Sequence, residues 1–196
     1  MARMKFLCDV DRCIECNACV TACNNEHDIP DSMNRRHVVT LNDGQPGEKS
    51  VSVACMHCTD PPCAAVCPVD CFYITPDGIV LHDKELCIGC GYCFYACPFG
   101  APQFPEQKAF GVRGKMDKCT FCAGGPLPDN SEAEYRRYGR NRIAEGKLPL
   151  CAEMCATKAL LAGDGDVVSE IYRQRVMNRR GSPDFWRWTV AYPPGK

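Results

Sequence analysis

Two stretches decide the fold of this chain: Cys13-Ile14-Glu15-Cys16-Asn17-Ala18-Cys19-Val20-Thr21-Ala22-Cys23 and Cys87-Ile88-Gly89-Cys90-Gly91-Tyr92-Cys93-Phe94-Tyr95-Ala96-Cys97. Both read C-x2-C-x2-C-x3-C, the thiolate spacing that surrounds a cubane iron–sulfur cluster. Two variant groups complete the pattern, namely Cys55, Cys58, Cys63 and Cys67, and Cys119, Cys122, Cys151 and Cys155. Sixteen of the 18 cysteines thus form four groups of four. They predict four 4Fe–4S clusters, whose iron these cysteines hold, and they indicate electron transfer.

An internal repeat relates the first and third groups. Shifted by 74 residues, segment 6–16 overlays segment 80–90, and both ligand cysteines, a leucine, an isoleucine and an aspartate coincide. A short apolar strand precedes each of these loops, and 51–54 reads as a third such strand. Segments 72–74 and 79–81 flank a turn at 76–78 and predict a hairpin that leads into the next loop. The order of loop, hairpin and loop is that of a bacterial two-cluster ferredoxin.

The ferredoxin pattern also predicts which cysteines share a cluster. In such a unit, the fourth cysteine of each run ligates the other cluster. The two central groups form one unit, so the first and last groups must pair with each other. The predicted ligand sets are Cys13, Cys16, Cys19 and Cys155 for cluster A; Cys23, Cys119, Cys122 and Cys151 for cluster B; Cys55, Cys58, Cys63 and Cys97 for cluster C; and Cys67, Cys87, Cys90 and Cys93 for cluster D. Proline follows Cys67 and Cys97 but not Cys23 or Cys155, so the turns after Cys23 and Cys155 are free to differ in shape from the other two.

The expected fold class is α+β, with two ferredoxin-like modules, one inserted within the other, joined by short hairpins, helices and long loops. The outer module comprises 1–50 and 105–165, with a helical insert at 123–150. The central module comprises 51–104, and 166–196 forms a C-terminal helix and an extended tail. Further predicted elements are a strand at 35–41, a helix over 132–145 capped by Ser131, a helix over 167–177, and an aromatic tail at 185–194 that packs on its own domain or on another subunit.

Composition narrows the possible functions. The formal net charge is −1, so nothing indicates nucleic-acid binding, and four thiolate-ligated cubanes would add roughly −8. We expect no Sec-type signal and no membrane anchor, because no apolar run approaches the ~20 residues of a membrane span. A disulfide framework is disfavoured, because C-x-x-C-x-x-C directs three thiols to one point. Zinc is the better alternative, but zinc sites usually pair two C-x2-C knuckles. We expect the apo-chain to be largely unfolded.

A few residues outside the ligand sets also attract attention. Cys71 matches an alanine in the equivalent turns, and Cys8 ends a strand, so both are predicted to be structural. His57 lies inside a cluster loop and is a candidate hydrogen-bond donor to a cluster sulfur. Lys118 and Lys158 lie beside ligands and are either surface residues or charges that raise a cluster's potential. The insert carries an arginine-rich helical face, which is either simply solvated or a docking surface.

The four groups in this order resemble the iron–sulfur subunits of molybdopterin oxidoreductases. That family includes subunits of formate dehydrogenase and of dimethyl-sulfoxide, nitrate and polysulfide reductases. Within it, three stretches are similar to the formate dehydrogenase beta subunit: 84–93, 114–126 and 138–142. Some members replace one cysteine with tryptophan and hold a 3Fe–4S cluster, whereas this chain keeps all sixteen cysteines. Some beta subunits end in a transmembrane helix, and we expect none here.

The resemblance implies a larger machine. A catalytic subunit with molybdenum or tungsten on a pterin cofactor would oxidise formate and pass electrons to this chain, which is not an enzyme by itself. A membrane cytochrome b or another carrier would accept them. It also implies a periplasmic location after export with the catalytic subunit, with membrane association through a partner; a cytoplasmic location is the alternative. A reductase subunit with inward electron flow, a free polyferredoxin and a zinc-stapled binding module remain as other hypotheses.

Overall fold

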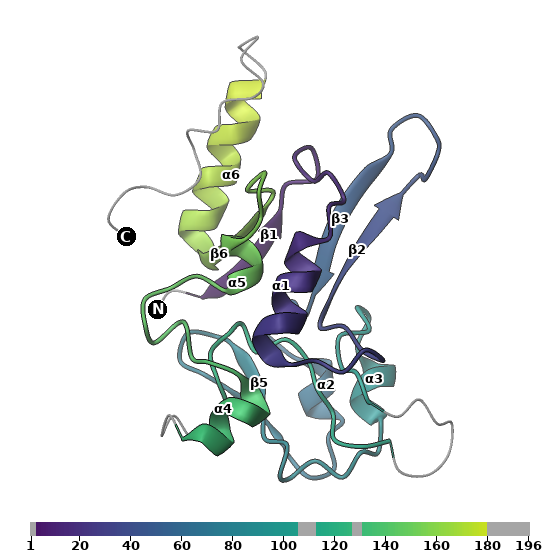
Figure 1. Cartoon of the computed structure of the whole chain (residues 1–196), viewed down its shortest axis with the longest axis vertical. Helices are drawn as coiled ribbons and strands as arrows, with labels where there is room; N and C mark the ends of the chain where they lie inside the picture. Colours follow the sequence, from purple (N-terminus) through teal and green to yellow (C-terminus); the bar gives the residue numbers. More distant parts are fainter. Residues whose placement is uncertain (1–2, 106–112, 127–130, 180–196) are drawn as a thin grey trace.

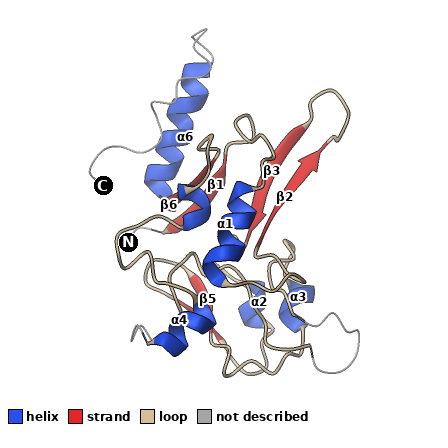
Figure 2. Ribbon diagram, in the orientation of Figure 1, coloured by secondary structure: helices blue, strands red, loops and turns tan. Residues whose placement is uncertain are grey.

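The computed structural model describes residues 3–105, 113–126 and 131–179. Within these ranges the chain forms three two-stranded antiparallel sheets and six helices, linked by long loops (Figure 1 and Figure 2). This mixture confirms the predicted α+β class. The aromatic tail predicted at 185–194 lies outside the described residues. None of the described helices combines the length and hydrophobicity that a bilayer crossing requires.

The strand before the first cysteine group pairs with the strand after the last one. β1 (Met4–Cys8) runs antiparallel to β6 (Leu160–Asp164), with Phe6 opposite Ala162. Helix α6 (Gly165–Arg179) follows β6 and packs on both strands, which confirms the helix predicted over 167–177. The buried carboxylate of Asp9 pairs with Arg179 at 2.5 Å and holds α6 against the loop after β1. The two ends of the predicted outer module are therefore joined.

The other predicted strands are confirmed. β2 (Arg36–Leu41) pairs with β3 (Lys49–Ala54), which runs directly into the second cysteine group. β4 (Phe72–Ile74) and β5 (Val80–His82) form the predicted hairpin between the second and third groups. The hairpin turn closes through a hydrogen bond from Gly78 N–H to the Thr75 carbonyl at 2.8 Å.

Four helices carry the third cysteine of the four groups, each time as their second residue. They are α1 (Ala18–His27) with Cys19, α2 (Pro62–Ala65) with Cys63, α3 (Tyr92–Ala96) with Cys93, and α5 (Leu150–Glu153) with Cys151. The fourth cysteine follows four residues later in every case. Helix α1 packs against α5, and α2 packs against α3. In Figure 1 the first pair lies near the middle of the molecule, and the second pair lies below it.

The helix predicted over 132–145 is much shorter than expected. Helix α4 spans Glu132–Tyr138, and its predicted cap is correct: the Ser131 hydroxyl accepts a hydrogen bond from Glu134 N–H at 3.2 Å. The helix ends because Gly139 has a φ of 82° and passes so close to α1 that a Cβ there would lie 2.1 Å from His27 Nδ1. The predicted end near Gly146 is therefore wrong. Arg142 also leaves the predicted charged face, because it is buried against Glu153.

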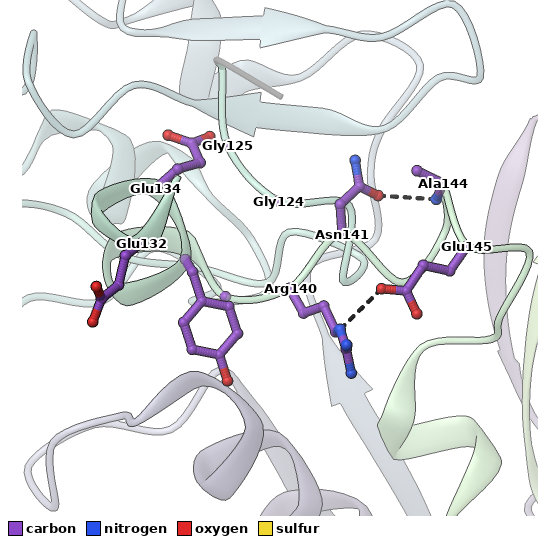
Figure 3. Close-up of a pocket in the computed structure, with 10 residues that line it drawn as sticks. Gly124, Gly125, Glu132, Glu134, Arg140, Asn141, Ala144 and Glu145 are labelled. Carbon is purple, nitrogen blue, oxygen red and sulfur yellow. Dashed lines mark hydrogen bonds and ion pairs between the residues drawn. The ribbon is translucent and has the colours of Figure 1, made fainter. Parts of the chain in front are cut away.

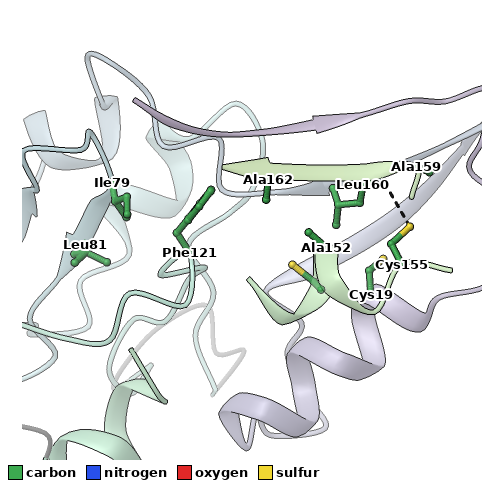
Figure 4. Packing of buried hydrophobic residues seen from close by; sticks show 10 residues of the cluster. Cys19, Ile79, Leu81, Phe121, Ala152, Cys155, Ala159, Leu160 and Ala162 are labelled. Atoms are coloured by element: carbon green, nitrogen blue, oxygen red, sulfur yellow. Dashed lines mark hydrogen bonds between the residues drawn. The ribbon is translucent and has the colours of Figure 1, made fainter. Parts of the chain in front are cut away.

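The largest described core cluster mixes aliphatic residues with cysteines. Its fully buried centre is Phe121, which lies between the hairpin residues Ile79 and Leu81 and the strand residue Ala162 (Figure 4). Cys19, Cys151 and Cys155 belong to the same cluster. Because predicted cluster ligands are part of this core, metal binding and core formation are expected to be coupled.

Candidate cluster-binding sites

Every cysteine loop bends through a left-handed residue just before its second cysteine. The φ angles are 57° at Glu15, 45° at His57, 71° at Gly89 and 59° at Phe121. Asn17 and Gly91, which are again 74 residues apart, are left-handed as well. The repeat seen in the sequence therefore extends to the backbone. A left-handed residue in such a loop turns successive backbone N–H groups toward one side. The resulting concavity suits an anion, and a thiolate-ligated cluster is an anion.

Backbone N–H groups also point at the cysteine sulfurs. Single donors lie 3.4 Å from four of them: Cys71 N–H on Cys67, Met116 N–H on Cys87, Phe121 N–H on Cys119, and Leu160 N–H on Cys155. The last of these is drawn in Figure 4. Hydrogen bonds of this kind stabilise negative charge on sulfur and are one of the means by which a protein sets cluster potentials.

Two cavities are ringed by cysteines of the central groups. One cavity is lined by Cys55, Cys58, Cys63 and Cys97, together with prolines, other apolar side chains and Lys118. A second cavity is lined by Cys67, Cys87, Cys90 and Cys93, by the additional cysteine Cys71, and by apolar residues that include Phe104 and Met116. These are the sets that the sequence assigns to clusters C and D. Four ligand sulfurs around a largely apolar hollow suit a cubane cluster.

The outer cysteines lie near one another. Cys19, Cys151 and Cys155 belong to one core cluster of buried residues, and Cys13 packs against it. Burial, followed by the charges of Cys119 and Cys151, raises the pKa of Cys23. Burial, followed by the charges of Cys151 and Cys119, raises the pKa of Cys122 to about 12. Cys16 is exposed.

The pKa values show what metal binding must accomplish. Burial raises the pKa of Cys119 to about 11 and, reinforced by the charge of Cys87, that of Cys93 to about 12. At neutral pH these free thiols would keep their protons. Iron binds thiolates, so cluster insertion must release protons from buried sulfurs. Positive charge beside these sulfurs therefore favours assembly.

Three of the four cysteines that end a group are followed by the same turn. The residue three positions on is left-handed and donates its N–H to the cysteine carbonyl: Asp70 to Cys67, Gly100 to Cys97, and Lys158 to Cys155. The Cys155 turn thus matches the proline-containing turns although Ala156 replaces the proline. Cys23 is the exception, because α1 continues past it to His27.

The two remaining cysteines differ in their contacts. Cys71 is buried, as expected, but its sulfur lies 3.5 Å from that of Cys67, and a hydrogen bond from its thiol lowers the pKa of Cys87 to about 5. Cys8 accepts a hydrogen bond from Ser52 N–H at 3.3 Å. Alanine occupies the equivalent of Cys71 in the other turns, at Ala101 and Ala159, and both alanines are buried.

Of the histidines, His27 and not His57 contacts a cysteine. His57 is buried, and its Nδ1 accepts a hydrogen bond from Val80 N–H at 3.1 Å. Its ring packs edge-on against Phe121 with centroids 5.4 Å apart. The Nε2 atom of His27 lies 3.4 Å from the Cys122 sulfur. Burial lowers the pKa of His27 to about 3, so this ring is neutral and faces a predicted cluster B ligand.

The two lysines beside ligands have different environments. Lys118 is fully buried, lines the cavity of the cluster C cysteines, and donates to the carbonyls of Val80 and Cys119. Lys158 is half-buried at a turn, and its Nζ donates to the Glu153 carbonyl at 2.6 Å. Only Lys118 therefore places its charge inside a cluster site.

Sequence reasoning missed two buried arginines at the start of β2. Arg35 forms an ion pair with Asp117 at 2.9 Å, and both side chains are buried. Arg36 is also buried, with its Nη1 donating to the Ser52 hydroxyl at 3.1 Å. The only signal in the sequence was an adjacent pair of charges before an apolar strand, and such a pair gives no indication of burial.

A wider surface pocket lies away from the cysteine cavities. It is bounded by α4 and by the 139–145 segment, and Glu132, Glu134, Arg140 and Glu145 contribute charged side chains to it (Figure 3). Arg140 and Glu145 pair across the segment at 2.9 Å. None of the described residues that line this pocket is a cysteine, so it does not resemble the cluster sites.

Fold and site together define a ferredoxin-like iron–sulfur protein. A family model described as a 4Fe-4S dicluster domain matches residues 48–126. The sequence is 65% identical over 97% of its length to a formate dehydrogenase iron-sulfur subunit of Wolinella succinogenes, and it covers 97% of that protein. It is 34% identical to the B subunit of the anaerobic dimethyl sulfoxide reductase of Escherichia coli, over 82% of this sequence and 73% of the relative. A thiosulfate reductase electron transfer subunit of Salmonella typhi is also 34% identical, over 97% of this sequence and 95% of the relative.

The chain belongs to this family of iron–sulfur subunits of oxidoreductase complexes. It binds 4Fe–4S clusters, and its cysteine number is consistent with four of them. It is an electron-transfer component and works beside a catalytic partner.

Proposed function

We propose that this chain conducts electrons from a formate-oxidising subunit, which carries molybdenum or tungsten on a pterin cofactor, to a cytochrome or another acceptor. The observation that carries the proposal is its 65% identity, over nearly the whole chain, to a formate dehydrogenase iron-sulfur subunit. Bound clusters supply the one-electron chemistry. The protein's residues hold the sulfurs, donate N–H groups to them and exclude water, and none of them acts on formate.

The proposed wiring is the interleaved one, with clusters A to D held by the ligand sets given above. The two cysteine-ringed cavities support sets C and D. Set A is supported by the core cluster that contains Cys19 and Cys155 and against which Cys13 packs; Cys151 of set B belongs to the same core cluster. The mutual charge effects among Cys23, Cys119, Cys122 and Cys151 support set B. The pairing of β1 with β6, and of α1 with α5, supports an outer module assembled from the two segments that flank the central one in sequence.

We further infer that the clusters are ordered A, B, C, D along the molecule. A ligand of each cluster lies beside a ligand of the next. The charge of Cys151 acts on Cys19, Cys55 packs with Cys119, and the charge of Cys63 acts on Cys93. Clusters A and D would then be the terminal ones.

Both ends of this proposed row reach the surface. Cys16 is exposed, and its loop neighbour Ile14 is 60% exposed. At the other end, Ile88 is 64% and Tyr95 73% exposed beside the cluster D loop. Apolar surface around both terminal clusters suits contact with the catalytic subunit at one end and the acceptor at the other. A periplasmic location, reached by export together with the catalytic subunit, completes the proposal; protease accessibility in spheroplasts tests it.

The decisive experiment is anaerobic reduction of the purified complex. We expect about sixteen irons per copy of this chain, and we expect formate to bleach the visible absorption of the clusters. The isolated chain, loaded with clusters, should not respond to formate but should be reduced by dithionite. Formate can reduce the clusters only through a catalytic subunit that oxidises formate. Clusters that ignore formate and instead give electrons to a sulfoxide or thiosulfate would therefore overturn the assignment. Stoichiometric zinc in place of iron would overturn the cofactor.

A further inference from the structure

Arg36 occupies the centre of the cluster region. It is the first residue of β2 and lies opposite Ala54, the residue before Cys55. Its side chain is 1% exposed, and its guanidinium carbon lies 4.4 Å from the centroid of the Phe6 ring. A guanidinium stays protonated at any pH the protein experiences, so this position carries a permanent buried charge.

The hydrogen bonds of Arg36 leave most of the guanidinium unused. Nη1 donates to Ser52, whereas Nε and Nη2 are buried and have no hydrogen-bond partner among the residues that the structure describes. Its neighbour Arg35 differs, because two of its nitrogens donate to the Asp117 carboxylate at 3.2 and 2.9 Å. No carboxylate pairs with Arg36 within the described ranges. A buried charge and buried N–H donors are costly without a partner, so this arrangement implies an anion that the protein atoms do not provide.

The groups that surround Arg36 identify this anion. Burial by itself lowers the pKa of the guanidinium, but the charges of Cys151, Cys119, Cys23 and Cys19 outweigh it and raise the pKa. Three of these cysteines belong to proposed set B, and Cys19 belongs to set A. The Ser52 hydroxyl that accepts from Arg36 lies 3.3 Å from the Cys19 sulfur. Arg36 therefore stands at the junction between the two outer cluster sites.

We propose that Arg36 is a positioning residue for electron transfer, a buried cation whose Nε and Nη2 face the sulfurs of clusters A and B and which raises the reduction potentials of both. The proposal rests on the proposed wiring. Each cluster gains one electron on reduction and becomes more negative by one charge. A fixed positive charge in a medium of low dielectric stabilises the reduced form more than the oxidised form. Clusters A and B thus accept electrons more readily than they would without Arg36.

The test is a redox titration of the cluster-loaded complex, monitored by electron paramagnetic resonance. In Arg36→Gln we expect the reduction equilibrium of clusters A and B to weaken at least tenfold, which is a fall of about 59 mV for a one-electron couple. Clusters C and D should keep their potentials. In Arg36→Lys, which keeps the charge but loses the forked donors, the same two clusters should shift in the same direction by a smaller amount.

Lys118 provides the matched comparison, because it is also buried, has no carboxylate partner in the part of the chain that the structure describes, and lines the cluster C cavity. Lys118→Met should lower the potential of cluster C and leave cluster A unchanged. Four cluster signals with unchanged potentials in Arg36→Gln would overturn the proposal, as would a shift spread evenly over all four clusters. If Arg36→Gln does not assemble, Arg36→Met takes its place, because it also removes the charge: an assembled Arg36→Met protein with wild-type potentials refutes the proposal. Iron content and reduction by formate are measured separately, so a failure of the proposed function stays distinguishable.

Discussion

Replacing Asp117 with asparagine would remove one buried charge and little volume. Asp117 lies just before Lys118 and Cys119, and its carboxylate accepts from the Lys118 N–H at 2.8 Å. It pairs with Arg35 at 2.9 Å and lies 3.5 Å from Lys84 Nζ. The substitution leaves the Arg35 charge buried without its counter-ion. We therefore expect a protein that folds but loses its clusters much faster.

The structure sets the size of this effect. Burial alone would raise the pKa of Asp117, yet the charge of Arg35, followed by those of Lys84 and His82, lowers it to about 2 from an ordinary 3.8. A difference of about two units corresponds to about 2 kcal/mol of stability at neutral pH. Because the folded pKa is depressed, this stability is present above pH 3.8 and is lost as the pH falls toward 2. Removing one partner of a buried pair costs more, about 3 to 5 kcal/mol, because Arg35 stays behind unpaired.

Cluster proteins unfold irreversibly, so the assay is a rate. Anaerobic bleaching of the visible absorption in guanidinium measures kinetic stability. A loss of about 3 kcal/mol that appears in the unfolding barrier accelerates bleaching roughly a hundredfold. The control is Glu132→Gln, which removes a carboxylate from an ion pair with Arg136 whose two side chains are both 76% exposed, and which should bleach at the wild-type rate. An Asp117→Asn protein that also bleaches at the wild-type rate would refute the argument that the ion pair of Asp117 with Arg35 holds the loop before Cys119.

Three further predictions concern the ligands, the loops and pH. Cys155→Ser should disturb the cluster of Cys13, Cys16 and Cys19 and spare the central two, as seen by electron paramagnetic resonance; loss of the Cys119 cluster alone would contradict the interleaved wiring. Gly89→Ala should impair assembly of cluster D, because a Cβ there would lie 2.6 Å from the Gly114 carbonyl oxygen, whereas Glu15→Gly at the equivalent turn should retain all four clusters. Burial holds the pKa of His82 well below 6.5. Below pH 6.5 this histidine is therefore protonated in the unfolded chain but stays neutral in the folded protein, which favours unfolding. Bleaching should thus accelerate as the pH falls, less steeply in His82→Gln, and an unchanged slope in that variant would exclude His82 as its source.

The sequence predicted those elements that short-range chemistry determines. Cysteine spacing indicated the clusters, and alternating apolar segments beside turn residues indicated the hairpin of β4 and β5. The Ser131 cap was also readable. Only the position of that helix's end was wrong, because Gly139 stops it through a close approach to His27, a residue more than 100 positions away in the chain.

What the sequence could not provide depends on long-range placement. Nothing in Met4–Cys8 identifies Leu160–Asp164 as its partner strand, and the left-handed φ of Glu15 or Phe121 is unusual for residues other than glycine. The contact of His27 with Cys122 joins the end of α1 to the last cysteine group, and it depends on the packing of the insert on α1. Arginines are rarely buried, so propensity argued against the observed position of Arg36.

The two adjacent arginines show how one charged dipeptide can serve two purposes. Both side chains are buried, and the charges of Cys23 and Cys119 act on both. Asp117 neutralises Arg35, which therefore contributes mainly to holding the loop before Cys119. Arg36 has no such carboxylate among the described residues, so its charge remains available to the negative clusters. A protein whose cofactors add roughly −8 to its interior needs compensating cations at fixed positions, and a partner such as Asp117 determines which of them act on the clusters.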